Sequence, residues 1–415
     1  MSDSDMNGTD MNYQIDRLDE ILQALRQRLR IAVVYSGDPR DPSAIIHRTH
    51  QARVWKSYEG VARDIAAALE RLGFSKVFLL REGRDLGAHL QRAEVHLAWL
   101  NCGGIQGFDP LAQAPALLEG LGIPYVGHRP ASATLLDNKY LCKRLLAGLG
   151  LPTAPFLLWH PRWASGLSEA TLLETFGTEQ GPWVVKPVNG RASRDVTYLE
   201  QAHELPALVA EIYGRTANAV LIESFLPGRE VAVGAAAPLR RVDGRWTRTR
   251  GAWCFAFIER LLAPQEHIFE SLDARPIDGS RARVLDRGQE GALIAKLQAL
   301  GRVVADHLHL RSMFRMDLRE DEHGELRILE INPKPDLKAP TSDGATSLLA
   351  LGLADAGVSY DELVLFQLAA AIDDGLSGLQ SSWGPIVEQL RLAGVPAGCP
   401  GSTVGKEVGA PKASG

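Results

Sequence analysis

Two periods of apolar residues alternate along the first third of the chain. Short runs rich in Val, Ile, Leu and aromatic residues predict buried strands, and the segments between them repeat apolar residues at helical spacing. The strands are expected at 30–38, 76–80, 94–101 and 123–127, and the helices at 13–29, 60–74 and 114–122. Strands that alternate with helices in this way over residues 31–128 indicate a doubly wound parallel sheet.

The carboxyl ends of two of these strands carry small and polar residues. Ser36-Gly37 follows the first strand, and Asn101-Cys102-Gly103-Gly104 closes the third. Ligands of open parallel sheets gather at the carboxyl ends of the strands, so a binding edge is expected there. Tight turns with no further role would explain the same glycines equally well.

The remainder of the chain follows a different pattern. A helix is expected at 134–149, and residues 220–335 are rich in strands around a helix at 289–310. This mixture predicts an α+β region, and a last helix is expected at 359–373. The polar start and the Gly-, Ser- and Pro-rich end are expected to be disordered. The predicted organisation is a disordered start at 1–12, domains at 13–128, 129–219 and 220–375, and a disordered tail at 376–415.

Composition narrows the class of protein without choosing a function. The chain has 415 residues, 45% of them hydrophobic and 23% charged, with a net charge of −5. These values are typical of a globular protein of two to three domains, and the acidic balance argues against a nucleic-acid partner. The 4 cysteines lie far apart and form no metal or disulfide pattern, which favours a reducing, cytoplasmic setting. No signal peptide and no apolar run of about 18 residues is seen, so no membrane partner is expected.

A predicted hairpin brings acidic side chains together. Arg315 and Asp317 share one strand face, as do Glu330 and Asn332, because residues two apart in a strand point the same way. A turn centred on the His-Gly pair at 323–324 would place Asp317 opposite Glu330 and Arg315 opposite Asn332. Like charges that face each other destabilise a ladder, whereas two carboxylates and an amide oxygen suit a divalent cation such as Mg²⁺. The alternative is a solvated hairpin edge that binds nothing.

Two places supply lysines that suit phosphate groups. Lys186 ends the apolar run PWVVKPV and is followed by a loop that contains Gly190 and Ser193. A lysine at the end of a buried strand is costly unless an anion meets it, and small residues let backbone N–H groups approach phosphate oxygens. The GxxxxGK[ST] phosphate loop is absent. Lys139 and Lys143 lie four residues apart on one helical face, although a pair of solvated helix lysines is the simpler interpretation of that motif.

A third segment, VLIESFLPGRE, ends an apolar strand with Glu223. A carboxylate and backbone groups beside Phe225 suit the edge and face of an adenine ring, and Glu230 could hold a ribose hydroxyl. An ordinary junction between a strand and a turn would have the same sequence, so the segment carries weight only together with the others.

Taken in chain order, these segments resemble the ATP-grasp superfamily and, within it, the D-alanine–D-alanine ligase group. The resemblance rests on GIPYVGHRPASATLLDNKYLCKRLLAGLGLPTAP, VVKP, LIESFLPGRE, FRMDL and LEINPKP, and it covers about residues 31–375. It implies an N-terminal parallel-sheet domain and a nucleotide held between two α+β domains. It also implies an enzyme that activates a carboxylate as an acylphosphate with ATP and then joins it to an amine, with a mobile loop at 188–195 that excludes water.

The resemblance also implies a role for each matching residue. Lys139 and Lys186 would contact the ATP phosphates, and Glu223 with the backbone of Ser224 and Leu226 would read adenine. Phe225 would lie beside the base and Glu230 on the ribose. One or two Mg²⁺ ions, or Mn²⁺, would be held by Asp317, Glu330 and Asn332. The catalytic residues would be Arg315, which stabilises the oxyanion of the tetrahedral intermediate, and Ser193 of the mobile loop.

The sequence departs from the family where the substrates bind. The loop VNGRASRD carries Arg191 and Arg194, and different residues follow Asn332. The candidate substrate residues are Glu59, Arg191, Arg194, Lys334, Asp336, Lys338 and Thr341. They favour a larger or more anionic acid than D-alanine, as in an amino-acid ligase of natural-product metabolism. The alternatives are a D-alanine–D-alanine ligase, an ATP-grasp enzyme that only phosphorylates or uses a non-amine nucleophile, and a non-catalytic nucleotide-binding protein. The resemblance makes a homodimer plausible.

Overall fold

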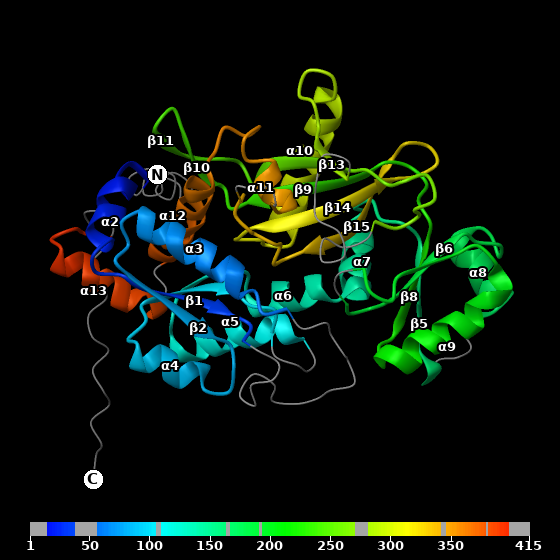
Figure 1. Ribbon diagram of the computed structural model, residues 1–415, viewed down its shortest axis with the longest axis horizontal. Coiled ribbons are helices and arrows are strands. Elements are labelled where there is room, and N and C mark those ends of the chain that lie inside the picture. The colour runs from blue at the N-terminus through cyan, green and yellow to red at the C-terminus, as the bar shows by residue number, and fades with distance from the viewer. Residues whose placement is uncertain are drawn as a thin grey trace, which may run out of the picture.

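The computed structural model of the chain places three sheets side by side (Figure 1). It describes residues 15–37, 56–104, 109–162, 167–190, 193–269, 281–341, 346–378 and 381–397. Within these ranges, none of the helices combines the length and the apolar character that crossing a membrane requires.

The first sheet has four parallel strands, as the alternation of strands and helices predicted. In spatial order they are β2 (Lys76–Arg81), β1 (Arg30–Tyr35), β3 (Leu97–Asn101) and β4 (Tyr125–Val126). The helices of this region are α2 (Leu18–Leu25), α3 (Glu59–Arg71), α4 (Leu86–Arg92) and α5 (Pro110–Leu121). The backbone N–H of Gly103 donates to Ser36 Oγ at 2.6 Å. The two polar strand ends therefore meet at the carboxyl edge.

The middle of the chain forms an antiparallel sheet at the right of Figure 1. Its strands, in spatial order, are β5 (Phe156–Trp159), β8 (Val220–Ser224), β6 (Trp183–Pro187) and β7 (Thr197–Leu199). The helices are α6 (Pro130–Asp137), α7 (Lys139–Gly148), α8 (Glu169–Phe176), the 3₁₀ turn η2 (Ala202–Glu204) and α9 (Leu205–Thr216). The single helix expected at 134–149 is wrong: Asn138 takes extended geometry, and its side chain accepts the N–H of Leu141 as an N-cap. Asparagine is a favoured N-cap, so Lys139 begins a new helix.

The third sheet has five antiparallel strands. Their spatial order is β13 (Ala282–Val284), β12 (Trp253–Arg260), β9 (Glu230–Ala236), β14 (Phe314–Glu320) and β15 (Leu326–Asn332). A small hairpin, β10 (Leu239–Val242) with β11 (Arg245–Arg248), and the helices α10 (Gly291–His307) and α11 (Leu348–Leu351) complete this region. The helix expected at 289–310 corresponds to α10.

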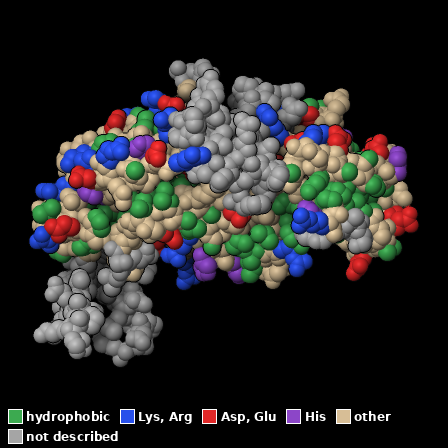
Figure 2. Space-filling model, turned by 90° about the horizontal axis from the view of Figure 1, so that it is seen from below, with side chains coloured by type: hydrophobic (Ala, Val, Ile, Leu, Met, Phe, Trp, Pro, Cys, Tyr) green, Lys and Arg blue, Asp and Glu red, His purple; other side chains and the backbone are tan. Residues whose placement is uncertain are grey.

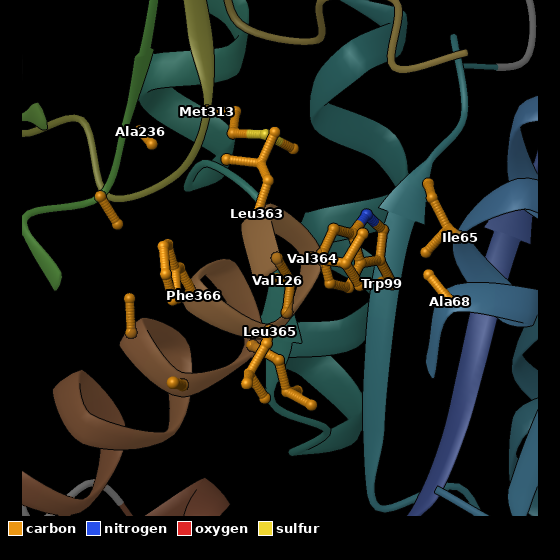
Figure 3. Packing of buried hydrophobic residues seen from close by; sticks show 14 of the residues in the cluster. Ile65, Ala68, Trp99, Val126, Ala236, Met313, Leu363, Val364, Leu365 and Phe366 are labelled. Carbon is orange, nitrogen blue, oxygen red and sulfur yellow. The ribbon is translucent and has the colours of Figure 1, made fainter. Parts of the chain in front are cut away.

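The C-terminal helices pack against the first domain. They are α12 (Tyr360–Ser377), the 3₁₀ turn η3 (Ser381–Trp383) and α13 (Gly384–Leu392). Figure 3 shows Val364 of α12 beside Trp99, with Ile65 of α3 beyond the tryptophan, and all three belong to one buried cluster. On the surface, Arg71 of α3 forms an ion pair of 2.6 Å with Asp361 of α12. The helix that was expected to close the third domain at 375 therefore packs against the first domain as well.

The disordered tail expected at 376–415 is wrong at its start. Residues 384–392 form α13, and Ile386 and Leu390 on one face of that helix are fully buried. The composition of this region is typical of a disordered tail, but its apolar residues are spaced as on one face of a short helix, and that spacing decides the structure. Residues 398–415 lie outside the described part of the chain.

Charges of both signs are mixed over the face of the molecule seen in Figure 2. Blue Lys and Arg side chains and red Asp and Glu side chains are interspersed there, and no basic stripe runs across the described part of this face. The mixture agrees with the net charge of −5.

Candidate functional site

A cleft of about 870 Å³, including space open to solvent, lies between the central antiparallel sheet and the five-stranded sheet. Many of the residues predicted from the sequence line it together. They are Lys139, Lys186, Ser193, Arg194, Glu223, Ser224, Phe225, Leu226, Glu230, Asp317 and Glu330. The cleft thus brings together segments nearly 200 positions apart in the chain.

The β14–β15 hairpin supplies the acidic wall of the cleft. As predicted, Asp317 pairs with Glu330 and Arg315 with Asn332. The predicted two-residue turn is wrong, because Leu318 pairs with Ile328 and the register shifts between Asp317 and Leu318. The closer pairs put the turn at residues 322–324, with Gly324 at φ 76°. A bulge at Leu329 then adds one residue and restores the predicted pairing; such bulges re-aim side chains beside functional sites.

Asp317 lies in a network of arginines. Arg315 donates from Nε and Nη2 to the two Asp317 oxygens, both at 2.7 Å, and Arg260 Nη2 donates to Oδ2 at 3.0 Å. Arg260 also donates to Glu230 Oε1 at 2.7 Å. Burial would disfavour the Arg260 guanidinium, but Asp317 and Glu230 more than compensate, so its pKa is raised. The buried Arg260 therefore binds both Asp317, a predicted metal ligand, and Glu230, the residue predicted to hold the ribose.

Glu330 faces lysines across the cleft. Lys139 Nζ lies 3.2 Å from Glu330 Oε2, and Arg315 Nη2 lies 3.9 Å from Oε1. Burial raises the pKa of Glu330, but Lys139, Lys186 and Arg315 outweigh it and lower the pKa to about 2. Glu330 is therefore a carboxylate at neutral pH, as a metal ligand must be.

The donor atoms at this wall fit a hard divalent cation. Asp317 and Glu330 line the same cleft from facing strand positions, and Asn332 follows one pleat further along β15. Two carboxylates with an amide oxygen match the preference of Mg²⁺, which leaves its other positions to water and phosphate. Within the described ranges, no group of three or more His, Cys, Asp or Glu side chains is arranged so that it could hold a metal ion. The site thus resembles a partial cage that a phosphate ligand would complete, rather than a closed metal centre.

Two lysines, Lys143 and Lys186, form ion pairs with one glutamate, Glu223. Lys143 is fully buried, with its Nζ 2.6 Å from Glu223 Oε1, and Lys186 Nζ pairs with Glu223 Oε2. The interpretation of Lys143 as a solvated helix lysine is therefore wrong. Burial and the neighbouring Lys186 hold the pKa of Lys143 well below its ordinary value. Burial and Lys139 lower the pKa of Lys186 to about 8. Both oxygens of Glu223 contact lysine.

The opposite end of the cleft is aromatic. The Phe225 ring meets Tyr198 edge-on at 4.8 Å and His267 at 5.7 Å between centroids. The Arg319 guanidinium lies over the Phe225 ring at 4.8 Å, and its Nη1 donates to the carbonyl oxygen of His267 at 2.7 Å. Arg319 also lies 3.6 Å from Glu230 Oε2. An apolar face beside a held carboxylate suits a base and its ribose.

The loop over the cleft contacts the segment after β12. Ser193 has φ 53°, an uncommon value for a residue other than glycine. Its Oγ donates to the carbonyl oxygen of Phe269 at 3.0 Å, and both residues line the cleft. This contact joins the two sides of the opening. Arg191, predicted to meet the substrate, lies outside the described residues.

The remaining predicted substrate residues lie apart from the cleft. Lys334 Nζ is 3.2 Å from the Tyr58 ring centroid and 3.5 Å from Asn101 Oδ1, at the carboxyl edge of the first sheet. Asp336 forms an ion pair of 3.6 Å with Lys56. These contacts join the chain after β15 to the first domain. Glu59 begins α3 and pairs with Arg63, Lys338 is half-buried, and Thr341 is exposed.

Two lining arginines were not predicted. Arg319 lies two residues beyond Asp317 on β14, so the face-sharing rule that paired Arg315 with Asp317 would have found it. Arg260 ends β12 after a run of buried residues, and nothing around it in the sequence indicates its partners.

Comparison with known proteins identifies the arrangement. A family model described as "D-ala D-ala ligase C-terminus" matches residues 145–368, more than half of the chain. A D-alanine–D-alanine ligase of Oleidesulfovibrio alaskensis is 32% identical over 312 residues, which span 73% of this chain and 88% of that protein. D-alanine–D-alanine ligase B of Pseudomonas putida is 27% identical over 83% of this chain and 93% of its own length.

Solved structures show the same fold. The D-alanine–D-alanine ligase of Bacillus anthracis complexed with ATP superposes with a TM-score of 0.59 and 18% identity, covering 84% of this chain and 99% of that one. The first domain, the two-sheet cleft and the matched sequence segments agree with the predicted ATP-grasp architecture. The chain belongs to the D-alanine–D-alanine ligase family of ATP-grasp carboxylate–amine ligases.

Proposed function

We propose that the protein uses ATP to join the carboxylate of one amino acid to the amine of another, and that D-alanine is the first substrate to test. The observation that carries the proposal is the cleft itself, where Lys139 and Lys186 face Glu330 and Asp317. Lysine side chains that can bind phosphate groups therefore lie in the same cleft as carboxylates that can bind a divalent cation. D-alanine is favoured because relatives that match over most of their length are named for it.

Residues on the two walls divide the work in this proposal. Lys139 and Lys186 bind the phosphates, and Glu223, Phe225, the Ser224 and Leu226 backbone and Glu230 hold the nucleoside. Asp317, Glu330 and Asn332 would hold one or two Mg²⁺ ions, which when bound neutralise phosphate charge. Preplaced charges of this kind usually supply the largest part of catalysis.

Arg315 serves the second half of the reaction. An acylphosphate made at the cleft would be attacked by an amine, and negative charge would develop on the carbonyl oxygen. Arg315 is held by Asp317 beside Glu330, so a guanidinium is placed before that charge forms. Ser193, through its contact with the Phe269 carbonyl, would keep the loop closed and protect the acylphosphate from water.

A different acceptor is the second candidate. Lys334 and Asp336 put two charged side chains where β15 meets the first domain, beside Tyr58 and Lys56. With Arg194 at the cleft mouth, they would suit a larger or more anionic acid, as in an amino-acid ligase of natural-product metabolism. The comparisons favour D-alanine over this reading.

An ADP-release assay over amino-acid pairs, with mass spectrometry of the products, tests both candidates. ADP and a dipeptide from D-alanine alone would support the first candidate and exclude the second. Release only with another acid and amine pair would do the reverse. Absence of ADP with every pair, in protein that binds ATP, would favour a non-catalytic nucleotide-binding role. We also propose that the protein forms a homodimer, and light scattering of the same sample would test this by measuring its molar mass in solution.

A further inference from the structure

Lys143 is a fully buried lysine on α7, close to the cleft but absent from its lining. A buried ammonium group is strongly unfavourable unless it is paired. Even when it is paired, an apolar residue of similar size often stabilises a fold equally well. Stability alone therefore gives no reason for a lysine at this position, and its contacts indicate another role.

The ammonium group of Lys143 lies between two parts of the fold. Its Nζ donates to Thr153 Oγ1 at 2.6 Å and pairs with Glu223 Oε1 at 2.6 Å. The Thr153 hydroxyl donates in turn to the carbonyl oxygen of Ile328 at 2.9 Å. Ile328 belongs to β15, two residues before Glu330. Lys143 thus connects the acidic hairpin to the central sheet.

Glu223 transmits this connection to the wall of the cleft. It lies on β8 in the middle of the central sheet, opposite Phe156 of β5 and Val184 of β6. One of its oxygens contacts Lys143 and the other contacts Lys186, which lines the cleft. Since each oxygen has a lysine partner, the orientation of the carboxylate depends on both ammonium groups.

We propose that Lys143 is a positioning residue of the nucleotide site, which holds Glu223 so that Glu223 holds Lys186 toward the phosphates. The inference rests on the proposed function, because it assumes that the cleft binds ATP. In this arrangement Thr153 and Lys143 keep the central sheet in register with the strand that carries Glu330. Lys143 itself touches neither the nucleotide nor the reacting atoms.

The role predicts a specific failure when the ammonium group is removed. In Lys143→Met the side chain keeps a similar length and loses its charge, so Glu223 has only Lys186 as a partner. The Glu223 carboxylate is then free to turn and to draw the Lys186 ammonium away from the cleft. Nucleotide binding should weaken. The variant should still fold, because methionine packs well in a hydrophobic core.

Calorimetric titration of ATP with excess Mg²⁺ into the full-length protein tests the proposal. Binding by Lys143→Met should be at least tenfold weaker than by the wild type. In the Glu223→Gln background, the same substitution should weaken binding less than threefold, because Lys143 acts through that carboxylate. Lys296→Met, at an exposed position of α10, is the matched control and should bind as the wild type does.

A purely structural role would give a different result. Lys143→Met would then melt at a lower temperature, while its folded fraction bound ATP within twofold of the wild type, and that outcome would overturn the proposal. If Lys143→Met does not fold, Thr153→Val keeps every charge and removes the bridging hydroxyl. At least threefold weaker binding supports the proposal, and unchanged binding overturns it. Wild-type protein that fails to bind ATP would instead overturn the proposed function.

Discussion

Asp317 and Glu330 face each other across the β14–β15 hairpin, although its turn is not centred on the pair. The bulge at Leu329 supplies the residue that brings them opposite, and it leaves Leu329 and Glu330 both on the wall of the cleft. Because Leu329 is unpaired in the ladder, its apolar side chain and the carboxylate of Glu330 reach the same side of the hairpin. Lys139, Arg315 and Arg260 then supply the positive charge that this acidic pair needs.

If Glu330 holds Mg²⁺ beside the phosphates as proposed, replacing it by Gln should lower the ligase rate by about 100-fold or more, because a preplaced charge is lost. The change keeps the shape of the side chain and leaves Lys139 without its carboxylate partner. ADP release with saturating substrates measures the effect. Glu322→Gln, in the exposed turn of the same hairpin, is the matched control and should be fully active. Undiminished turnover by the Glu330 variant would exclude this acid from the metal site.

Replacing Arg260 by Met should destabilise the protein by about 3 kcal/mol, because Glu230 and Asp317 would each lose a partner while buried. If Asp317 holds Mg²⁺ as proposed, activity should fall about tenfold, because Arg260 orients that carboxylate. Urea unfolding and the Mg²⁺ dependence of ADP release measure the two effects. Arg391→Met removes an exposed, solvent-screened ion pair of α13 and should leave stability unchanged. Equal stability of the two variants would show that the Arg260 network is not needed for folding.

Local patterns predicted many of the elements and several charged residues of the cleft, because both depend on neighbours in the sequence, and the family resemblance added further lining residues such as Ser224 and Arg194. The acids on β14 and β15 were found from the two-residue strand period, and their pairing was right although the turn was wrong. The error at the turn and the omission of the bulge cancelled each other. A bulge leaves no reliable trace in the pattern of LRILEIN, so only the structure shows why the pairing is right.

Residues whose role depends on distant partners could not be predicted in the same way. The helical spacing of Lys139 and Lys143 indicates two solvated lysines, because the partner that buries Lys143, Glu223, lies 80 positions away in the chain. Arg260 carries no local signal, because Glu230 and Asp317 reach it only through the strand order of the five-stranded sheet. The C-terminal helices likewise pack against residues of the first domain that are far away in the sequence, so no local pattern indicates this contact.

Because His128 is buried, we expect the free energy of unfolding to fall in mild acid. Its Nε2 contacts the carbonyl oxygen of Met313 at 2.9 Å, and burial lowers its pKa to about 4 from the ordinary 6.5. Between these two values the unfolded chain binds a proton that the folded chain does not, so stability falls as pH falls through 6.5. By pH 5 the loss from this group is about 2 kcal/mol.

Urea unfolding at pH 7 and pH 5 of the wild type and of His128→Gln checks this prediction. The glutamine amide nitrogen reaches about as far as the histidine Nε2 that contacts the Met313 carbonyl oxygen, but it does not titrate. The wild type should lose about 2 kcal/mol more than the variant between the two pH values. Parallel losses in the two proteins would mean that His128 is already protonated in the folded state or not buried in solution.

Gly375 of α12 tests whether α13 is part of the folded core. A Cβ atom at this position would lie 1.8 Å from the indole of Trp383, which is buried next to α13. Gly375→Ala should therefore destabilise the protein by about 2 kcal/mol through overpacking, even though alanine favours a helix. Gly214→Ala in α9, where a Cβ atom meets nothing within 4 Å, should instead be neutral or stabilise by about 0.5 kcal/mol. Thermal unfolding of both variants measures the difference. If both substitutions stabilised the protein alike, the Trp383 side chain would not be held against α12, and the segment after residue 376 would be the loose tail that its composition suggests.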